Sequence, residues 1–382
     1  MERVYALARA KVNLVLDVTG KYADGYHSIE TVMQSVDLSD ELVFTATGYN
    51  GDCGGTGYRC DYGGANCRGG CDGWRDVGAG WPDGAGIEVV CDDPKVPSDS
   101  SNLVVRAAMR LKELALAGGS RADGRPGGVR IEIHKRIPVA AGLAGGSADA
   151  AATLIALNAL WGLGLSRDEL LRVGASVGAD VPFCMIGGTC IARGRGDEVV
   201  PLAGMPEVIF ILLTSDVGLS TREIYQTYDA CELEGWTCGE YPTRGEENPN
   251  GLSRRGTGRP LSSGRVADMV TAVKDGELRA IGRFLYNALE PVATNKMPAI
   301  RQARQILAEA GALGVTMSGS GPAVFGIFDP RDLVLTDGEA RQGQEGAGGK
   351  DTSTVSAGPN PGEAWGKGPG TGGLAAGGLV AA

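Results

Sequence analysis

The stretch PVAAGLAGGSADAAATLIALNALWGLG, residues 138–164, decides how the rest of the chain is interpreted. Gly142, Gly145, Gly146 and Ser147 stand directly before an apolar run that predicts a helix beginning near the serine. Glycines allow backbone amides to approach a ligand closely, and the first-turn amides of a helix favour an anion. The stretch is therefore either a tight turn that packs a helix on a sheet or a loop shaped to hold phosphate.

Strands and helices alternate outward from this loop, without a regular βαβ rhythm. Ser101 is the expected N-cap of the helix that precedes the loop, and Ser166 with Glu169 forms a capping box for the helix that follows it. The patterns predict helices over 101–118, 151–161, 166–178 and 297–311, and strands over 11–20, 40–47, 86–93, 128–138, 207–215, 314–319 and 322–329. This mixture indicates an α+β protein with two lobes.

Composition and charge exclude several classes of protein. The chain has 382 residues, enough for two domains, and a net charge of −10. A general binder of nucleic acid or of an anionic membrane usually carries a basic field, so neither partner is expected. No apolar run approaches the roughly 20 residues that a membrane span needs, and Arg9, Lys11 and Asn13 interrupt any signal-peptide core. We expect a cytoplasmic protein, either a monomer or a homodimer.

Three polar or glycine-rich segments lack usable periodicity. Residues 48–86 and 231–260 are interpreted as surface insertions, and residues 331–382 as a disordered tail. The first insertion holds Cys53, Cys60, Cys67 and Cys71. Structural zinc sites typically pair cysteines two to four residues apart, and in this set only the last interval fits, so an unliganded loop is favoured and no metal site is predicted.

The central loop is neither a P-loop nor a G-x-G-x-x-G fingerprint, so another nucleotide-binding family must be considered. PVAAGLAGGSADAA, residues 138–151, resembles the central motif of the GHMP kinases, whose loop wraps the phosphates of ATP. ARAKVNLVLDVTGKYADGYHSIETVMQSVDLSDEL, residues 8–42, looks like the first segment of the members that act on a cytidine diphosphate methylerythritol. GVTMSGSGPAVFGIF, residues 314–328, is similar to the third motif of the superfamily, and the three motifs occur in the expected order.

This resemblance implies a fold and a domain division. The N-terminal domain would cover 1–200 and resemble domain 2 of ribosomal protein S5, and a ferredoxin-like C-terminal domain would cover 201–330. The implied reaction is the ATP-dependent phosphorylation of the 2-hydroxyl of 4-diphosphocytidyl-2-C-methyl-D-erythritol, a step toward isoprenoid precursors, with Mg²⁺.

The resemblance also implies which residues contact the ATP phosphates. The implied set is the whole central loop: Pro138, Val139, Ala140, Ala141, Gly142, Leu143, Ala144, Gly145, Gly146, Ser147 and Ala148. The family usually has a second serine at the position of Ala148, so this chain offers one hydroxyl there, from Ser147, where the family usually offers two.

Two residues are implied for the chemical step. GADVPF matches the segment that carries the catalytic aspartate of the family, which makes Asp180 the base. Lys11 would lie beside Asp180, keep it ionised and stabilise the developing phosphate charge. Without the resemblance, an Asp before VPF is usually a turn or a helix cap, and a Lys in a strand is usually an edge charge.

Four residues are implied for the substrate. Asn13, Tyr26 and His27 would bind the cytidine diphosphate part, with His27 hydrogen-bonding the edge of the cytosine. Tyr225 would stack across the base from Tyr26, and such stacking contributes about 1–3 kcal/mol per base. The alternatives are a core aromatic residue for Tyr26 and a turn histidine for His27. His134, on the polar face of its strand, is expected to be solvated.

Two other functions remain open on the sequence. One is another small-molecule kinase of the same superfamily, of the homoserine or mevalonate type. The other is a catalytically inactive nucleotide-binding regulator, which the insertions and Ala148 allow, although the presence of both Lys11 and Asp180 counts against it.

Overall fold

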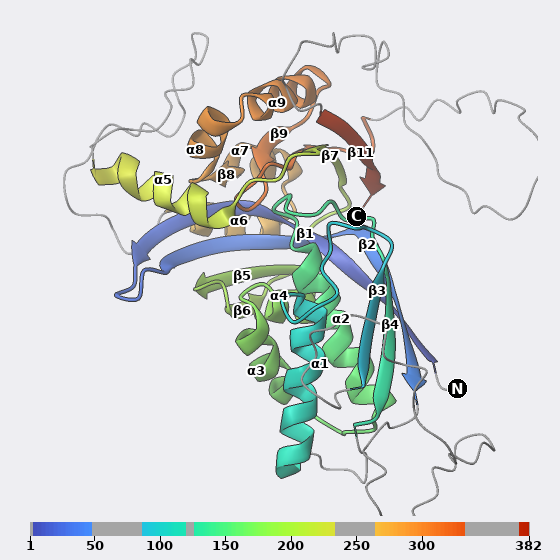
Figure 1. Ribbon diagram of the computed structural model, residues 1–382. Helices are drawn as coiled ribbons and strands as arrows, with labels where there is room; N and C mark the ends of the chain where they lie inside the picture. Colours follow the sequence, from blue (N-terminus) through green and yellow to red (C-terminus); the bar gives the residue numbers. More distant parts are fainter. Residues whose placement is uncertain (1–2, 48–85, 120–125, 234–263, 333–373, 382) are drawn as a thin grey trace, which may run out of the picture. The chain divides into compact units, whose positions relative to one another are not determined.

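The protein forms two compact units in a computed structural model that describes residues 3–47, 86–119, 126–233, 264–332 and 374–381 (Figure 1). The first unit comprises residues 1–10, 38–139 and 144–186, and the second comprises 11–37, 140–143 and 187–382. Two long strands, β1 (Arg3–Lys21) and β2 (His27–Thr47), contribute residues to both units. The units therefore do not follow a single boundary near residue 200, and the predicted domain limits stay a prediction.

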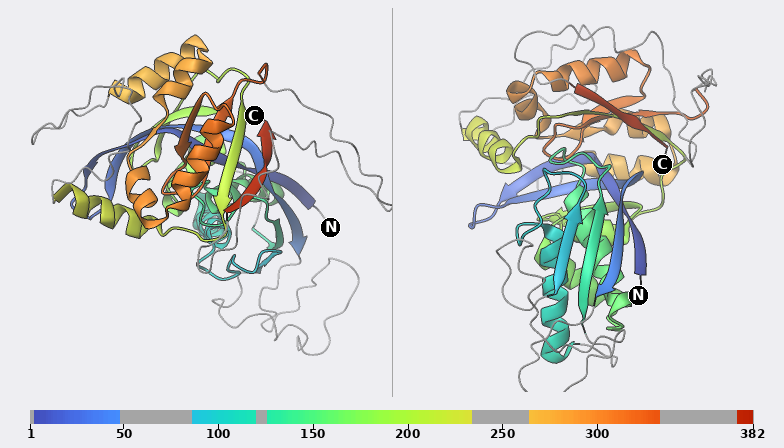
Figure 2. Two further views of the ribbon diagram at one scale, coloured as in Figure 1. Left: turned by 90° about the horizontal axis from the view of Figure 1, so that it is seen from above. Right: turned by 45° about the vertical axis from the view of Figure 1, so that its right-hand side comes forward.

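The first unit is a sheet covered by helices. Its strand β4 (Gly128–His134) pairs in parallel with β3 (Ile87–Cys91) and antiparallel with residues 41–47 of β2. The helical segments are α1 (Leu103–Leu114), the π-helical turn η1 (Ala115–Gly119), α2 (Gly145–Leu160), α3 (Arg167–Val177) and α4 (Val181–Ile186). Figures 1 and 2 show α1 and α2 side by side over one face of β3 and β4.

The alternation of apolar residues in β4 explains how this unit forms its core. Val129, Ile131 and Ile133 are at most 1% exposed, because every second side chain of a strand points to the same face. They pack with the buried faces of α1 and α2 in one apolar cluster. This cluster holds the helix that follows the central loop against the sheet.

The second unit contains the remaining strands and helices. Its described elements are β5 (Thr189–Gly194), β6 (Glu198–Pro201), β7 (Ile209–Ser215), α5 (Thr221–Leu233), α6 (Gly264–Asp275), α7 (Leu278–Phe284), β8 (Tyr286–Asn287), α8 (Glu290–Lys296), α9 (Ala299–Glu309), β9 (Gly314–Met317), β10 (Val324–Phe328) and β11 (Leu374–Ala381). β5 pairs with residues 29–34 of β2, and β8 pairs with β1.

A four-stranded antiparallel sheet in the order β11-β7-β10-β9 organises this second unit. In both views of Figure 2, α9 lies over the sheet, where Ile300, Ala303 and Leu307 join the apolar cluster that also holds Met317 and Val324. α7 crosses the start of β9 so closely that a Cβ on Gly314 would lie 2.1 Å from the carbonyl oxygen of Gly282. Only glycine fits there.

The α+β class with two lobes is confirmed, and several boundaries differ from the prediction. Asn102, not Ser101, caps α1: its side chain accepts from the amide of Val104 at 2.9 Å, whereas the Ser101 hydroxyl bonds to Asp99. The helix after the central loop begins at Gly145, shortly before the predicted start near Ser147 and well before the periodic stretch that starts at Ala151. A helix that starts on two glycines has no propensity signal at its first turn, because glycine is a poor helix former.

The predicted disordered tail is wrong for residues 374–381, which form β11 on the open edge of β7. An edge strand such as β7 presents unpaired amides and carbonyls with which another extended segment can pair. A short glycine-containing segment can therefore form a strand there without a strong strand pattern of its own. The described residues exclude 333–373 and nearly all of both insertions. The four clustered cysteines of the first insertion therefore lie outside the described residues. No described helix combines the length and the apolar character that crossing a bilayer requires. The cytoplasmic location and the choice between monomer and homodimer stay predictions.

Candidate active site

The backbone of the central loop is left-handed at every second residue. Ala140, Gly142 and Ala144 have φ angles of 56°, 80° and 57°. This conformation costs a non-glycine residue roughly 1–2 kcal/mol, and such strain is retained mainly where function requires it. Left-handed residues next to turn residues can direct neighbouring amides toward one side, as in concave backbone sites that bind anions. The loop has the backbone geometry expected of a phosphate-binding segment.

Gly142 is required at the tightest point of this loop. A Cβ at this residue would lie 2.2 Å from the backbone oxygen of Ser318, and its positive φ disfavours side chains as well. The oxygen of Gly142 accepts the hydroxyl of Ser318 at 2.9 Å and the ammonium of Lys11 at 3.2 Å. The loop segment is therefore fixed by side chains that come from two other motifs.

Backbone hydrogen bonds join the same three motifs. The amide of Lys11 donates to the oxygen of Leu143 at 3.1 Å, and the amide of Ala323 donates to the oxygen of Ala141 at 3.1 Å. Within the second unit, residues of the three motifs thus lie together, although more than 100 residues separate the two partners of each bond.

Asn13 connects β1 to the third motif. Its Oδ1 accepts from the Lys11 ammonium at 2.6 Å and from the Gly319 amide at 2.9 Å, and its Nδ2 donates to the hydroxyl of Thr31 at 2.9 Å. The residue is only 2% exposed. These bonds orient Lys11, whereas a direct contact of Asn13 with substrate stays a prediction.

The helix α2 begins without a side-chain cap. Its N-cap residue is Ala144, whose side chain makes no capping hydrogen bond. Ser147 is half-buried in this turn, and Ala148 is 2% exposed within the apolar core of the unit. The burial explains why a methyl group is acceptable at position 148, because a hydroxyl buried there would need its own partner. The first-turn amides and the Ser147 hydroxyl are polar groups of this helix start, and the Lys135 ammonium lies beside Gly145.

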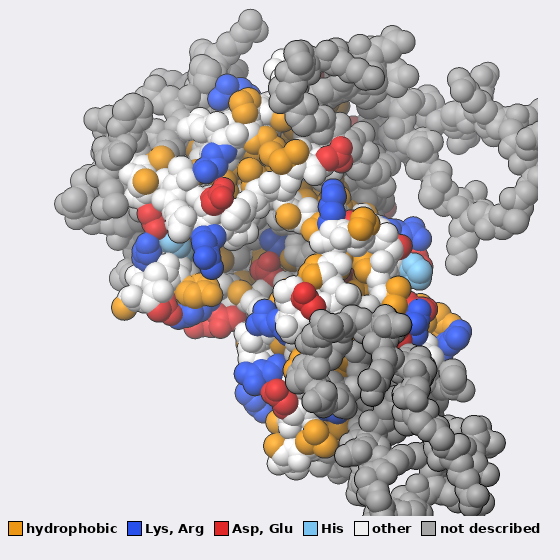
Figure 3. All heavy atoms as spheres, viewed as in Figure 1, with side chains coloured by type: hydrophobic (Ala, Val, Ile, Leu, Met, Phe, Trp, Pro, Cys, Tyr) orange, Lys and Arg blue, Asp and Glu red, His pale blue; other side chains and the backbone are white. Residues whose placement is uncertain are grey.

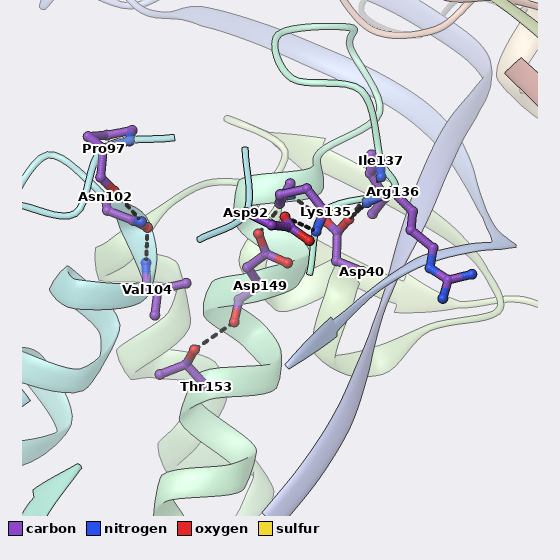
Figure 4. Close-up of polar contacts among 10 residues, drawn as sticks. All are labelled: Asp40, Asp92, Pro97, Asn102, Val104, Lys135, Arg136, Ile137, Asp149 and Thr153. Carbon is purple, nitrogen blue, oxygen red and sulfur yellow. Dashed lines mark hydrogen bonds and ion pairs between the residues drawn. The ribbon is translucent and has the colours of Figure 1, made fainter. Parts of the chain in front are cut away.

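A buried lysine next to the central loop links two carboxylates, those of Asp40 and Asp149 (Figure 4). The ammonium of Lys135 lies 2.5 Å from Oδ2 of Asp40 and 2.9 Å from Oδ2 of Asp149. Oδ1 of Asp40 accepts the amides of Arg136 and Ile137 at 2.6 and 2.8 Å. Because Lys135 precedes the loop and Asp149 follows it, the ion triad fixes both flanks of the loop within the first unit.

The members of this triad differ in how their surroundings shift their pKa values. Burial raises the pKa of Asp149 to about 7, with a further contribution from Asp40, although Lys135 opposes the shift. Burial alone would lower the pKa of Lys135, but the two carboxylates raise it above its ordinary value. One ammonium thus serves two carboxylates, and Oδ1 of Asp149 is buried without a hydrogen-bond partner. Burial therefore outweighs the Lys135 ammonium at Asp149 and raises the pKa of that carboxyl group toward neutral.

The two residues predicted for catalysis lie in different compact units. Lys11 is buried on β1 and holds Asn13 and Gly142, as described above. Asp180 is half-buried in the turn between α3 and α4, and its backbone oxygen accepts from the amide of Cys184 at 3.0 Å. Their pairing stays a prediction.

Three of the residues predicted for the substrate lie near the start of β2 and on α5. His27 stacks on Tyr225 with ring centroids 4.5 Å apart and an interplanar angle of 28°. Tyr26 is 62% exposed, and the guanidinium of Arg195 covers its ring at 4.6 Å. The ring that contacts Tyr225 is therefore His27 rather than Tyr26, and both tyrosines remain candidates for stacking on a base.

Local sequence patterns do not predict the partners of Lys135 and His27. Asp149 stands in the central motif and Lys135 lies shortly before it, but Asp40 is 95 residues from Lys135, and no local pattern connects them. Asp229, which hydrogen-bonds His27, lies 202 residues from it. Short-range patterns do not reveal such pairs, because tertiary packing brings them together.

Side chains of both charges share the visible surface of the described residues. On the face in Figure 3, Lys and Arg side chains of the described residues are interspersed with Asp and Glu side chains. His134 is exposed at the end of β4 and 3.3 Å from Asp92, as a solvated residue would be.

Comparison with known proteins defines the class of this loop and of its surroundings. The model of the GHMP kinases N terminal domain matches residues 102–188, and that of the GHMP kinases C terminal matches residues 269–336. The chain is similar to a homoserine kinase from Cytophaga hutchinsonii, with a TM-score of 0.54 over 86% of this chain and 85% of that chain, at 19% identity. The strand, loop and helix around residues 138–148 are those of a GHMP kinase.

Relatives with higher sequence identity identify one family of kinases within this class. The chain is 38% identical to the 4-diphosphocytidyl-2-C-methyl-D-erythritol kinase of Pelotomaculum thermopropionicum over 85% of this chain and 88% of the relative. It is 35% identical to the kinase of the same name from Acaryochloris marina, over 85% and 86%. A crystal structure of 4-(cytidine 5'-diphospho)-2C-methyl-D-erythritol kinase is similar at a TM-score of 0.56 and 29% identity, over 85% and 89%. The chain belongs to the family of 4-diphosphocytidyl-2-C-methyl-D-erythritol kinases.

Proposed function

We propose that this protein transfers the γ-phosphoryl group of ATP to the 2-hydroxyl of 4-diphosphocytidyl-2-C-methyl-D-erythritol, a step in the supply of isoprenoid precursors. Family membership supports the reaction, since relatives of this name align over about 85% of the chain. The structural observation that carries the proposal is the central loop, whose backbone is left-handed at three alternate residues and leads into an uncapped helix.

The loop suits a polyphosphate for two physical reasons. The amides at the start of α2 have no side-chain cap, so an anion can accept their hydrogen bonds. The helix dipole adds a favourable interaction with negative charge of about 0.3–1 kcal/mol at an exposed end. We assign the phosphate contacts to the loop residues 138–148 as a group.

Mg²⁺ is proposed as the metal that accompanies the nucleotide. No group of three or more His, Cys, Asp or Glu side chains in the described part of the chain could hold a metal ion. Mg²⁺ does not need such a group of side chains, because it commonly binds through substrate phosphates, waters and one or two protein oxygens. The Ser147 hydroxyl is the suitable protein donor at the start of α2. The Ser147 hydroxyl would help to hold the ion, which would supply positive charge to offset the negative charge that develops during transfer.

Asp180 and Lys11 are proposed for the chemical step. Asp180 would accept the proton of the attacking hydroxyl, which allows the alcohol to attack as phosphoryl transfer proceeds. The Lys11 ammonium, oriented by Asn13, would stabilise negative charge on the transferred group. The cytidine part of the acceptor is proposed to bind to Tyr26, His27 and Tyr225. Asn13 is proposed both to orient Lys11 and to contact the substrate.

The decisive experiment is a phosphorus NMR assay of the full chain with Mg-ATP and the cytidylylated methylerythritol. We expect a new phosphate monoester signal as ATP is consumed. Homoserine and mevalonate serve as parallel acceptors and should give none. Phosphorylation of either, with no product from the cytidylylated acceptor, would replace the proposal with another kinase activity of the superfamily. ATP binding without turnover of any acceptor would favour a regulator.

Asp180→Asn tests the assignment of the base. The variant should bind ATP as the parent does but lose turnover by two orders of magnitude or more, on the order of what removal of a general base costs. Steady-state kcat and the ATP dissociation constant should be measured on the same preparation. Unchanged kcat would remove Asp180 from the mechanism.

A further inference from the structure

Two side chains of α5 hold the imidazole of His27 from two sides. Tyr225 stacks on the ring, and Oδ1 of Asp229 lies 2.6 Å from Nε2. Because Tyr225 and Asp229 are four residues apart on one helix, they share a face and act on the same ring. The His27 side chain is 10% exposed. Both the plane of the ring and the hydrogen bond of one ring nitrogen are therefore determined by α5.

The charge state of Asp229 determines which way that hydrogen bond runs. Partial burial raises the pKa of Asp229, but hydrogen bonds and charge from Lys21 and His27 outweigh it and leave the pKa below its ordinary value. The Lys21 ammonium lies 2.6 Å from Oδ2 of the same carboxylate. An ionised carboxylate can only accept hydrogen bonds, so Nε2 of His27 donates. In the neutral imidazole, the other nitrogen, Nδ1, is then an acceptor.

We propose that Asp229 is a positioning residue that fixes the Nε2-protonated tautomer of His27 and thereby selects a cytosine base over a uracil base. This inference rests on the proposed function, because it assumes that His27 faces the edge of the base.

The selection follows from the groups at one position of the pyrimidine ring. Cytosine has an exocyclic amino group, which donates a hydrogen bond, whereas uracil has a carbonyl at that position, which accepts. Nδ1 as an acceptor pairs with the amino group and meets the carbonyl with two lone pairs facing each other. A site built to pair one polar group discriminates strongly against a ligand that leaves the group unpaired.

The test compares the affinities of CMP and UMP for the full chain and for two variants, by calorimetry at about pH 8, where an ordinary imidazole is neutral. The parent should bind CMP at least tenfold more tightly than UMP. Asp229→Asn can present an amide N–H to Nε2, which moves the proton to Nδ1 and makes that nitrogen a donor. The ratio of CMP to UMP affinity should then fall by about tenfold or more, which is roughly 1.4 kcal/mol.

Glu223→Gln is the matched control. Glu223 lies on the same helix, is exposed and is 3.8 Å from Lys296, so its change from carboxylate to amide leaves His27 and Asp229 as they are. Its ratio of CMP to UMP affinity should equal that of the parent. An Asp229→Asn variant that also retains the parental ratio would overturn the inference, while phosphorylation of the cytidylylated acceptor by the parent would still support the proposed function.

A second measurement needs no change at Asp229. The chain has two histidines, His27 and His134, so nitrogen NMR of ¹⁵N-histidine-labelled protein gives two imidazole patterns, and His134→Gln identifies them. His27 should show a protonated Nε2 and an unprotonated Nδ1. The reverse pattern would overturn the inference whatever the enzyme phosphorylates. A parent that neither prefers CMP nor phosphorylates the cytidylylated acceptor would instead overturn the proposed function and this inference together.

Discussion

The helices α2 and α3 belong to the same compact unit and begin in opposite ways. α3 starts at an extended residue, Ser166, whose hydroxyl accepts from the amide of Glu169, and the Glu169 carboxylate accepts from the amide of Ser166 at 2.9 Å. α2 starts at Ala144, a left-handed residue without any side-chain cap, followed by Gly145 and Gly146.

At the start of α3, side chains of the helix itself hydrogen-bond the first amides, whereas the start of α2 leaves its first amides available to a ligand. The capping box of α3 needs no other molecule, and such a cap contributes about 0.5–2 kcal/mol. The start of α2 forgoes that stabilisation and carries backbone strain in addition. Its position is held by tertiary contacts instead, through Lys135 on one flank of the loop and Asp149 on the other. Variants of the two starts should therefore affect different properties.

The largest effect is expected for Gly142→Ala. Its Cβ would meet the backbone oxygen of Ser318 at 2.2 Å, so the loop must shift. A displacement of the phosphate contacts by about 1 Å can lower turnover on the order of 100-fold. Gly311→Ala is the control, because Gly311 has a similar φ of 89° at the end of α9 but no atom within 4 Å of its Cβ.

Kinetics and thermal unfolding of both variants separate the two effects. Gly311→Ala should lose roughly 1 kcal/mol of stability from backbone strain and retain kcat/KM for ATP. Equal losses of activity in the two variants would show that strain alone, rather than the shape of the loop, explains the result.

The next largest effect is expected for Ala144→Asp. The new carboxylate would place negative charge beside the α2 amides and compete with phosphate for them. Asp and Asn both tolerate a left-handed backbone, so Ala144→Asn is a neutral control of similar shape. The KM for ATP should rise roughly tenfold more for Asp than for Asn. Identical values for the two variants, from initial rates at varied ATP, would argue against an anion site at this helix start.

A smaller effect, on stability, is expected for Asp149→Asn. The raised pKa of Asp149, about 7, means that the folded protein binds this proton more tightly than the unfolded chain. The associated stability is fully present below about pH 4 and is lost as the pH rises through 7. The variant lacks this titration, so its unfolding free energy relative to the parent should rise between pH 4 and 8, by at most roughly 4 kcal/mol.

Urea unfolding at several pH values measures this difference. Asp168→Asn serves as the control at the start of α3, where the carboxylate is exposed, and its relative stability should change little over the same range. A parent and an Asp149→Asn variant with parallel pH profiles would show that the carboxylate titrates in its ordinary range.

The smallest effect is expected for Ser166→Ala. Removal of the hydroxyl breaks half of the capping box and should lower the unfolding free energy by about 1 kcal/mol. Turnover and the KM for ATP should stay at the parental values, because the start of α3 satisfies its own amides. A loss of activity comparable with that of the Ala144→Asp variant would end the distinction between the two helix starts.

Local patterns predict the starts of these helices to different degrees. The capping box of α3 is visible in the sequence, since Ser166 and Glu169 are three residues apart and need no distant partner. The cap of α1 is placed one residue early, at Ser101, because Ser and Asn are almost equally good N-caps and packing decides between neighbours. The start of α2 is expected near Ser147, slightly after its true start at Gly145, because glycines carry no helical signal.

The sequence by itself determines the α+β class, the strands and helices with clear periodicity, and the three motifs that indicate a GHMP kinase. These properties depend on interactions between residues a few positions apart. Only the tertiary structure decides that Gly142 meets Ser318, that one lysine joins Asp40 to Asp149, and that Asp229 holds His27. Such contacts depend on how distant segments pack together, and packing is a property of the whole core rather than of any local pattern.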